Sequence, residues 1–124
     1  MNWRRSLVND IISTMLPEIF SDILDRKKIR NISIDVQFES LPKGIQGYCG
    51  IEDDGEYIIS MNRNQTKEEL IVNMVHELIH AMQVERGDTF NYSLPYSEQI
   101  HEIEAYNKQE IYAEIYKLNK VWSV

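Results

Sequence analysis

The segment from residue 66 to residue 86 constrains the fold most, because it has the pattern of a helix that is apolar on nearly every side. Thr66 and Glu69 have the spacing of a capping box at its start, and Gly87 is suited to end it. The apolar positions are Leu70, Ile71, Val72, Met74, Val75, Leu78, Ile79, Ala81 and Met82. We therefore expect this helix to be buried.

Helices are also predicted towards the two ends of the chain. Residues 5–16 have apolar side chains at helical spacing, and Pro17 separates them from a second such stripe over residues 19–24. Because proline is poorly tolerated inside a helix, we expect a kinked helix or two short ones. A second long helix is predicted over residues 97–121. Residues 121–124 either form the packed end of that helix or fold back into a cleft.

Three strands are predicted between these helices. Every second residue is apolar over 32–38, which is typical of a half-buried strand. Residues 45–51 and 56–61 are joined across Asp54-Gly55, a strong hairpin signal. We expect the first strand to lie parallel to the third, in the spatial order first, third, second. The predicted fold class is therefore α+β, with a small three-stranded mixed sheet.

This strand order leaves residues 45–51 at an edge of the sheet, where N–H and C=O groups have no partner strand. Such an edge can dock an extended peptide, which adds itself as one more strand. Gly47 and Gly50 lie in this segment and let another backbone approach closely. The strand is therefore predicted to face a cleft beside the apolar helix.

The composition indicates one acidic domain spanning residues 1–124. Hydrophobic residues make up 43% and charged residues 27%, and the formal net charge is −7. That charge repels phosphate backbones, so we expect no nucleic-acid partner. No apolar run approaches the ~20 residues of a membrane span, and the first residues make a poor signal peptide, so we expect no membrane partner. The single cysteine, Cys49, is predicted to be a small buried residue, and the predicted location is the cytoplasm.

A polar stripe runs down one side of the apolar helix, formed by Asn73, His76, Glu77, His80 and Gln83. Burying such groups without partners costs roughly 1–3 kcal/mol for each of them. The stripe must therefore face hydrogen-bond partners, a ligand or a metal ion.

The centre of this stripe has the HExxH pattern. His76 and His80 lie on the same face of the helix, so both imidazoles can reach one zinc ion at ~2.0–2.1 Å. Glu77 lies about 100° round the helix from His76, which places it beside a metal-held water rather than among the ligands. We therefore predict zinc as the cofactor and Glu77 as the general base in the attack on a carbonyl group.

A catalytic zinc ion needs a third protein ligand and an open fourth position. The helix over 97–121 offers Glu98, His101, Glu102 and Glu104 as candidates. Glu102 and Glu104 lie about 200° apart round a helix, so both cannot face one ion. Residue type and spacing leave the choice among the four open.

The two motifs together resemble the gluzincin zinc peptidases. His76-Glu77-Leu78-Ile79-His80 matches their HExxH sequence, and Glu102-Ile103-Glu104-Ala105 on the next helix resembles their ExxA motif. The small size is similar to that of the minigluzincins, which are single-domain peptidases.

This resemblance implies a zincin-like fold, with Glu102 as the third ligand on a C-terminal glutamate helix. A His101 ligand would instead resemble SprT-like metalloproteins. The sequence departs from the gluzincin pattern at Tyr106, where many members have Asp or Asn bonded to a zinc histidine. We expect Tyr106 to be a weaker orienter of that imidazole.

The loop between the two motif-bearing helices contains Tyr92 and Tyr96. In zinc peptidases a Tyr or His often donates a hydrogen bond to the oxyanion. The resemblance therefore implies this role for Tyr92 or Tyr96, and Tyr96 is our catalytic candidate. Packing with a solvated hydroxyl is the alternative for both.

The sequence thus predicts a zinc-dependent endopeptidase that acts on a peptide or unfolded protein. Two alternatives remain. One is a zinc-binding regulatory or self-inhibited module that has the same fold without efficient turnover. The other is a hydrolase that acts on an amide other than a peptide.

Overall fold

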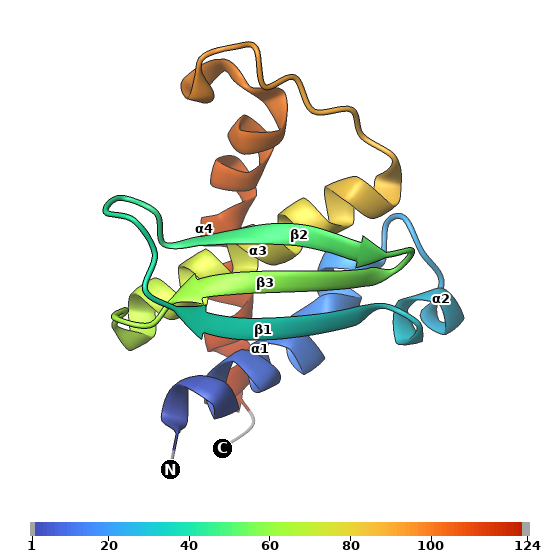
Figure 1. Cartoon of the computed structure of the whole chain (residues 1–124). Coiled ribbons are helices and arrows are strands. Elements are labelled where there is room, and N and C mark those ends of the chain that lie inside the picture. Colours follow the sequence, from blue (N-terminus) through green and yellow to red (C-terminus); the bar gives the residue numbers. More distant parts are fainter. Residues whose placement is uncertain (1, 123–124) are drawn as a thin grey trace.

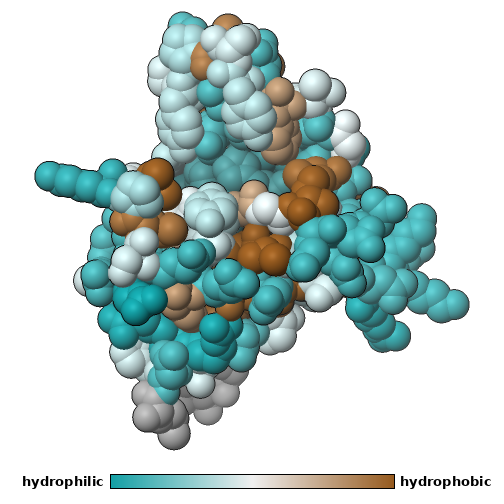
Figure 2. All heavy atoms as spheres, in the orientation of Figure 1, coloured by the Kyte–Doolittle hydropathy of each residue, from teal (hydrophilic) through white to brown (hydrophobic). Residues whose placement is uncertain are grey.

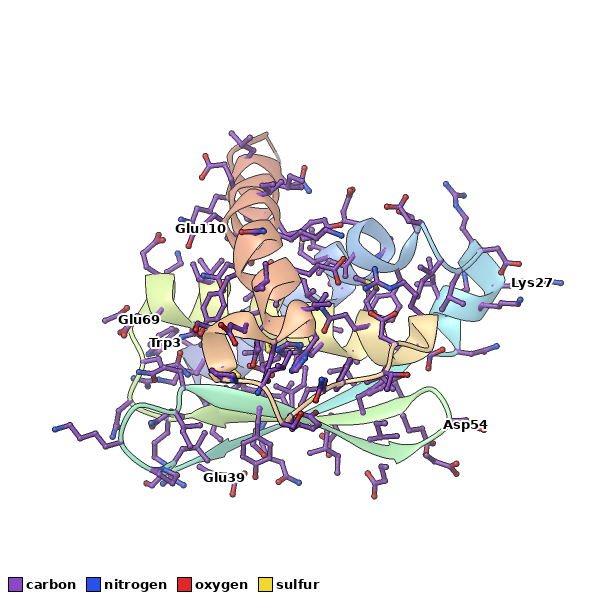
Figure 3. The ribbon with its side chains drawn as sticks, turned by 90° about the horizontal axis from the view of Figure 1, so that it is seen from above. Trp3, Lys27, Glu39, Asp54, Glu69 and Glu110 are labelled. Carbon is purple, nitrogen blue, oxygen red and sulfur yellow. The ribbon has the colours of Figure 1, made fainter. Side chains whose placement is uncertain are left out.

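The computed structural model describes residues 2–122 and has two layers, a sheet and a set of helices that covers one face of it (Figures 1 and 3). This arrangement confirms the α+β fold class. Along the chain the elements are α1 (Trp3–Phe20), α2 (Arg26–Arg30), β1 (Ser33–Glu39), β2 (Gly47–Asp53), β3 (Glu56–Asn62), α3 (Lys67–Arg86), the 3-10 turn η1 (Tyr96–Glu98) and α4 (Ile100–Trp122).

The sheet has the predicted order, β1-β3-β2. Strand β1 is parallel to β3, and β2 is antiparallel to β3 across the Asp54-Gly55 turn, as expected. Strand β2 begins two residues later than predicted, and its pairing is irregular between Ile51 and Asp53. The shift moves Ile45 and Gln46 into the loop that precedes the strand.

In the N-terminal region, one continuous helix is found instead of two short ones, and a further short helix was not predicted. Helix α1 continues through Pro17 to Phe20, because the proline lies in the last turn and Ser21 N–H still bonds to Pro17 O at 3.1 Å. The five-residue helix α2 was not predicted. It is capped by Asp25, whose side chain accepts a hydrogen bond from the backbone N–H of Lys28.

Helix α3 is buried as predicted, between the sheet, α1 and α4 (Figure 1). Its capping box is present, since Thr66 accepts from the Glu69 N–H and the Glu69 carboxylate accepts from the Thr66 N–H. Gly87 ends it in the left-handed conformation at φ 88°. The core is built from both layers and includes Ile11, Met15, Phe20, Ile59, Met61, Leu70, Met74, Leu78 and Ile79, all with no exposed surface.

The two edges of the sheet differ in whether side chains bind their backbone carbonyl groups. At the β1 edge, Arg5 Nη1 donates to Val36 O at 2.6 Å and Arg63 Nη2 donates to Phe38 O at 3.4 Å. The side chains of these arginines thus occupy carbonyl groups that a further strand would need. Strand β2 forms the opposite edge, as predicted, and it borders a cleft.

Helix α4 begins at Ile100, three residues later than predicted, because residues 96–98 form a 3-10 turn. The chain is still helical at Trp122, and the rest of the predicted tail, residues 123–124, lies outside the described residues. Within residues 2–122, no helix is both long enough and apolar enough to cross a membrane.

Candidate metal centre

Three potential ligand atoms meet where α3 packs against α4. Glu102 Oε1 lies 3.0 Å from His76 Nε2 and 2.8 Å from His80 Nε2, and the two imidazole nitrogens are 3.1 Å apart. This cluster could hold a metal ion. The ligand atoms of one tetrahedral zinc ion, bonded at ~2.0–2.1 Å, would lie about 3.3 Å apart. The spacing of the cluster is close to that value.

The protonation of His80 follows from its hydrogen-bond partner, Gln83. The Gln83 amide nitrogen donates to the backbone oxygen of His101 and to Glu104 Oε1, both at 2.8 Å. Its oxygen must therefore accept, and it lies 2.7 Å from His80 Nδ1. His80 thus carries a proton on Nδ1, and in the neutral imidazole the lone pair of Nε2 faces the cluster.

His76 is held in the same tautomer from the other helix. Its Nδ1 lies 2.8 Å from the side-chain oxygen of Gln109 on α4, which accepts the Nδ1 proton. With both histidines in this state, the two Nε2 lone pairs and the Glu102 carboxylate oxygen face one another. Three acceptors this close repel one another unless a cation lies between them, so the donor set fits a metal ion.

The other candidates for the third ligand lie outside this cluster. Glu98 is exposed on the 3-10 turn. Glu104 is bound by Gln83, Arg86 and Lys108. His101 stacks on Phe90, with ring centroids 4.4 Å apart, and so is not a solvated surface residue. Among residues 2–122, Glu102 is the one acidic or histidine side chain that joins His76 and His80.

The pKa values of the two buried glutamates of the site, Glu102 and Glu77, are shifted in opposite directions. Burial raises the pKa of Glu102, but the close contacts of its carboxylate with the imidazoles of His76 and His80 outweigh that effect and hold its pKa well below the ordinary value. Burial dominates at Glu77 and raises its pKa, although His80 and His76 act in the opposite direction. Glu102 is therefore the stronger anion, and Glu77 is the more basic carboxylate.

Glu77 lies beside the cluster and is only 5% exposed. Among residues 2–120, no group donates a hydrogen bond to its carboxylate, and the side chain lines two adjoining cavities of about 360 and 220 Å³. The structure therefore places Glu77 as predicted, next to the cluster but outside the set of converging atoms.

The two cavities form a cleft between the β2 edge and the loop that leads to α4, visible as a hollow with a hydrophilic floor (Figure 2). The larger cavity lies against Gly44–Gly47, and the smaller one against Tyr48 and Cys49. Burial raises the pKa of the Cys49 thiol to about 12. That cysteine stays protonated at neutral pH.

The structure gives the glycines of β2 different roles. A Cβ atom at Gly47 would lie 2.7 Å from Met61 Sδ and 3.0 Å from Ser60 O, so this residue must be small for the sheet itself to pack. The nearest atom at Gly50 would be Ile58 O at 3.8 Å, which is ordinary contact. A substitution at Gly47 would therefore disturb the fold as well as any docking at the edge.

The tyrosines of the cleft are only partly as expected. Tyr96 lines both cavities, and its hydroxyl lies 3.1 Å from that of Tyr106. Burial, followed by the hydrogen bonds with Tyr106 and Glu102, raises the Tyr96 pKa, so the hydroxyl keeps its proton. Tyr92 lines the smaller cavity, and its ring packs in a T-shaped arrangement against that of His101, with centroids 5.4 Å apart.

The expectation that Tyr106 orients a zinc histidine is wrong. Its ring lies against that of His76, with centroids 4.8 Å apart, and its hydroxyl faces Tyr96. Gln109, one turn further along α4, holds His76 Nδ1 instead. The seven-residue spacing from Glu102 to Gln109 is two helical turns, and this was the available sequence signal.

No family model, curated protein or solved structure matches this chain. The functional argument therefore depends on the residues of the cleft and their geometry.

Proposed function

We propose that this chain is a zinc-dependent endopeptidase, similar to the gluzincins and most like the minigluzincins. The observation that carries the proposal is the convergence of His76 Nε2, His80 Nε2 and Glu102 Oε1 beside the carboxylate of Glu77, which lines the cleft. Two imidazoles and one carboxylate form a donor set used by catalytic zinc. When bound, zinc would supply Lewis-acid activation of water and of a carbonyl oxygen.

Glu77 has the position and basicity of a general base. It would accept a proton from the attacking water as the water oxygen bonds to the carbonyl carbon. It would then pass this proton to the leaving amine nitrogen as the C–N bond breaks. The raised pKa of Glu77, caused by burial, supports both transfers.

Tyr96 is the candidate donor to the carbonyl oxygen as that oxygen gains negative charge. Its hydroxyl is protonated, lines both cavities and lies near Glu102. A neutral donor of this kind stabilises a developing oxyanion without first losing a proton.

The proposed substrate is a peptide or an unfolded protein segment that adds to the β2 edge. This edge borders the cleft that contains Glu77, whereas arginines occupy carbonyl groups at the β1 edge. Main-chain hydrogen bonds along β2 would hold the segment extended. The net charge of −7 supports a partner other than nucleic acid. With one cysteine and no disulfide, we place this activity in the cytoplasm.

The test combines zinc content with hydrolysis of a reduced and alkylated protein that cannot refold. We expect one zinc ion per chain, cleavage that stops with a chelator, and recovery when zinc is restored. Glu77→Gln should retain zinc and lose hydrolysis, because the amide keeps its size but not its basicity. Zinc binding without cleavage would favour the regulatory module, and no stoichiometric metal would contradict both readings.

A further inference from the structure

The larger cavity contains a hydrogen-bond acceptor that the proposed chemistry does not use. Asn73 lies three residues before His76 on α3, so its side chain lies on the same face of the helix. It lines the cavity of about 360 Å³ together with Glu77 and the loop that precedes β2. Which atom of the Asn73 amide faces the cavity decides what the cavity can bind.

The orientation of Asn73 is fixed by Gln65, which is 2% exposed. The amide nitrogen of Gln65 donates to Gln46 O at 3.1 Å and to Asn62 O at 2.9 Å, which uses both of its N–H groups. Its side-chain oxygen must therefore accept, and it accepts from Asn73 Nδ2 at 2.7 Å. One N–H group of Asn73 is thus bound within the protein, and the oxygen of this amide is turned away from Gln65.

That oxygen is available to a ligand. Among residues 2–120, no group donates a hydrogen bond to Asn73 Oδ1. The carboxylates of Glu77 and Glu102 line the same cavity, so an acidic group entering it would be repelled. The smaller cavity shares His76, Glu77 and Glu102 with the larger one, and Phe90, Tyr92 and Val84 also line it.

We propose that the larger cavity receives a substrate side chain adjacent to the scissile bond, and that Asn73 selects one with an N–H donor. The class comprises Asn, Gln, Lys and Arg, in preference to aliphatic and acidic residues. This assignment rests on the proposed peptidase function. A hydrogen bond to a neutral donor corresponds to about a two- to tenfold preference over an isosteric aliphatic side chain, and a charged donor to more.

The test is cleavage of a degenerate peptide library by the zinc-loaded protein, with cut sites read by mass spectrometry. We expect enrichment of N–H donors at one position beside the cut. Asn73→Leu should abolish that enrichment while other positions keep their profiles. Asn119→Leu, the same change at an exposed site on α4, should leave the profile unaltered.

Asn73→Leu also removes the partner of buried Gln65, so Asn73→Ala is measured beside it, since a water molecule can then reach Gln65. Zinc stoichiometry reports whether each variant retains the site. Cleavage by the wild type with a profile that neither variant changes overturns the role of Asn73 and leaves the peptidase function standing. No cleavage by the zinc-loaded wild type overturns both.

Discussion

The two imidazoles of the candidate metal centre are held in different ways. His80 is oriented from its own helix by Gln83, which has no exposed surface and uses both of its N–H groups within the protein. His76 is oriented across the helix interface by Gln109, whose amide nitrogen lies 3.4 Å from Glu110, a long distance for a hydrogen bond.

The two imidazoles are therefore oriented by different parts of the structure. The partner of His80 belongs to a network that continues through Glu104 to Arg86 and Asp88. The partner of His76 depends mainly on the docking of α4 against α3. We therefore expect His80 to be the more rigidly oriented ligand, and the variants below rank the two arrangements by their effect on metal affinity.

The largest effect is expected at Glu102, which contacts both imidazoles. Glu102→Ala should remove stoichiometric zinc after gel filtration, a loss beyond the about 10–100-fold typical of an outer hydrogen-bond partner. Elemental analysis of the purified protein measures it, with the exposed Glu98→Ala as the matched control. Equal zinc in Glu102→Ala and the wild type would move the third ligand elsewhere.

The second-largest effect is expected for Gln83→Leu, which should reduce zinc affinity by about 100-fold. The variant removes the acceptor of the His80 Nδ1 proton and leaves the His101 carbonyl without its donor. Competition with a chromogenic chelator gives the affinity. Thermal unfolding of the metal-free proteins separates this effect from the stability cost of roughly 1–3 kcal/mol for the unpaired buried groups.

Gln109→Leu should weaken zinc binding by about tenfold, because a single, partly exposed hydrogen bond is lost. Gln109→Glu should restore the affinity, since a carboxylate accepts the Nδ1 proton more strongly than an amide does. The same chelator competition applies. A larger loss from Gln109→Leu than from Gln83→Leu would contradict the ranking of the two imidazoles.

The sequence predicted those features that depend on the residue pattern within a single helix or strand. The HExxH spacing put His76 and His80 on one face, and periodicity predicted the burial of α3. The hairpin signal and the rules for strand connections predicted the sheet order. Strand β2 was shifted by two residues, because Gly47 and Gly50 weaken the alternation that marks a strand. The short helix α2 has too few turns to show a period.

The roles of Gln109 and Tyr106 could not be assigned in the same way. Both lie near the face of α4 that carries Glu102, and only the packing of α4 against α3 decides which of them reaches His76 Nδ1. Sequence spacing gives the face of a helix but not the depth at which two helices cross.

The smallest effect is expected at Glu104, which touches the metal centre only through Gln83. Hydrogen bonds from Arg86 outweigh burial and, with those from Lys108 and Gln83, lower the pKa of Glu104 from 4.5 to about 2. Glu104→Gln retains an acceptor for Gln83, so zinc affinity should change by less than about threefold, well below the effect of Gln83→Leu.

Glu104 should instead affect the stability of the metal-free protein, by at most about 1 kcal/mol, because its ion pairs are partly exposed to water. Its folded-state pKa lies below the unfolded value, so its stabilisation is fully present above pH 4.5 and is lost as the pH falls towards 2. The gap in the free energy of unfolding between wild type and Glu104→Gln should therefore close over that range. Denaturant titrations at pH 6, 4.5 and 3.5 measure the gap, and a constant value would show that Glu104 acts through packing rather than through its charge.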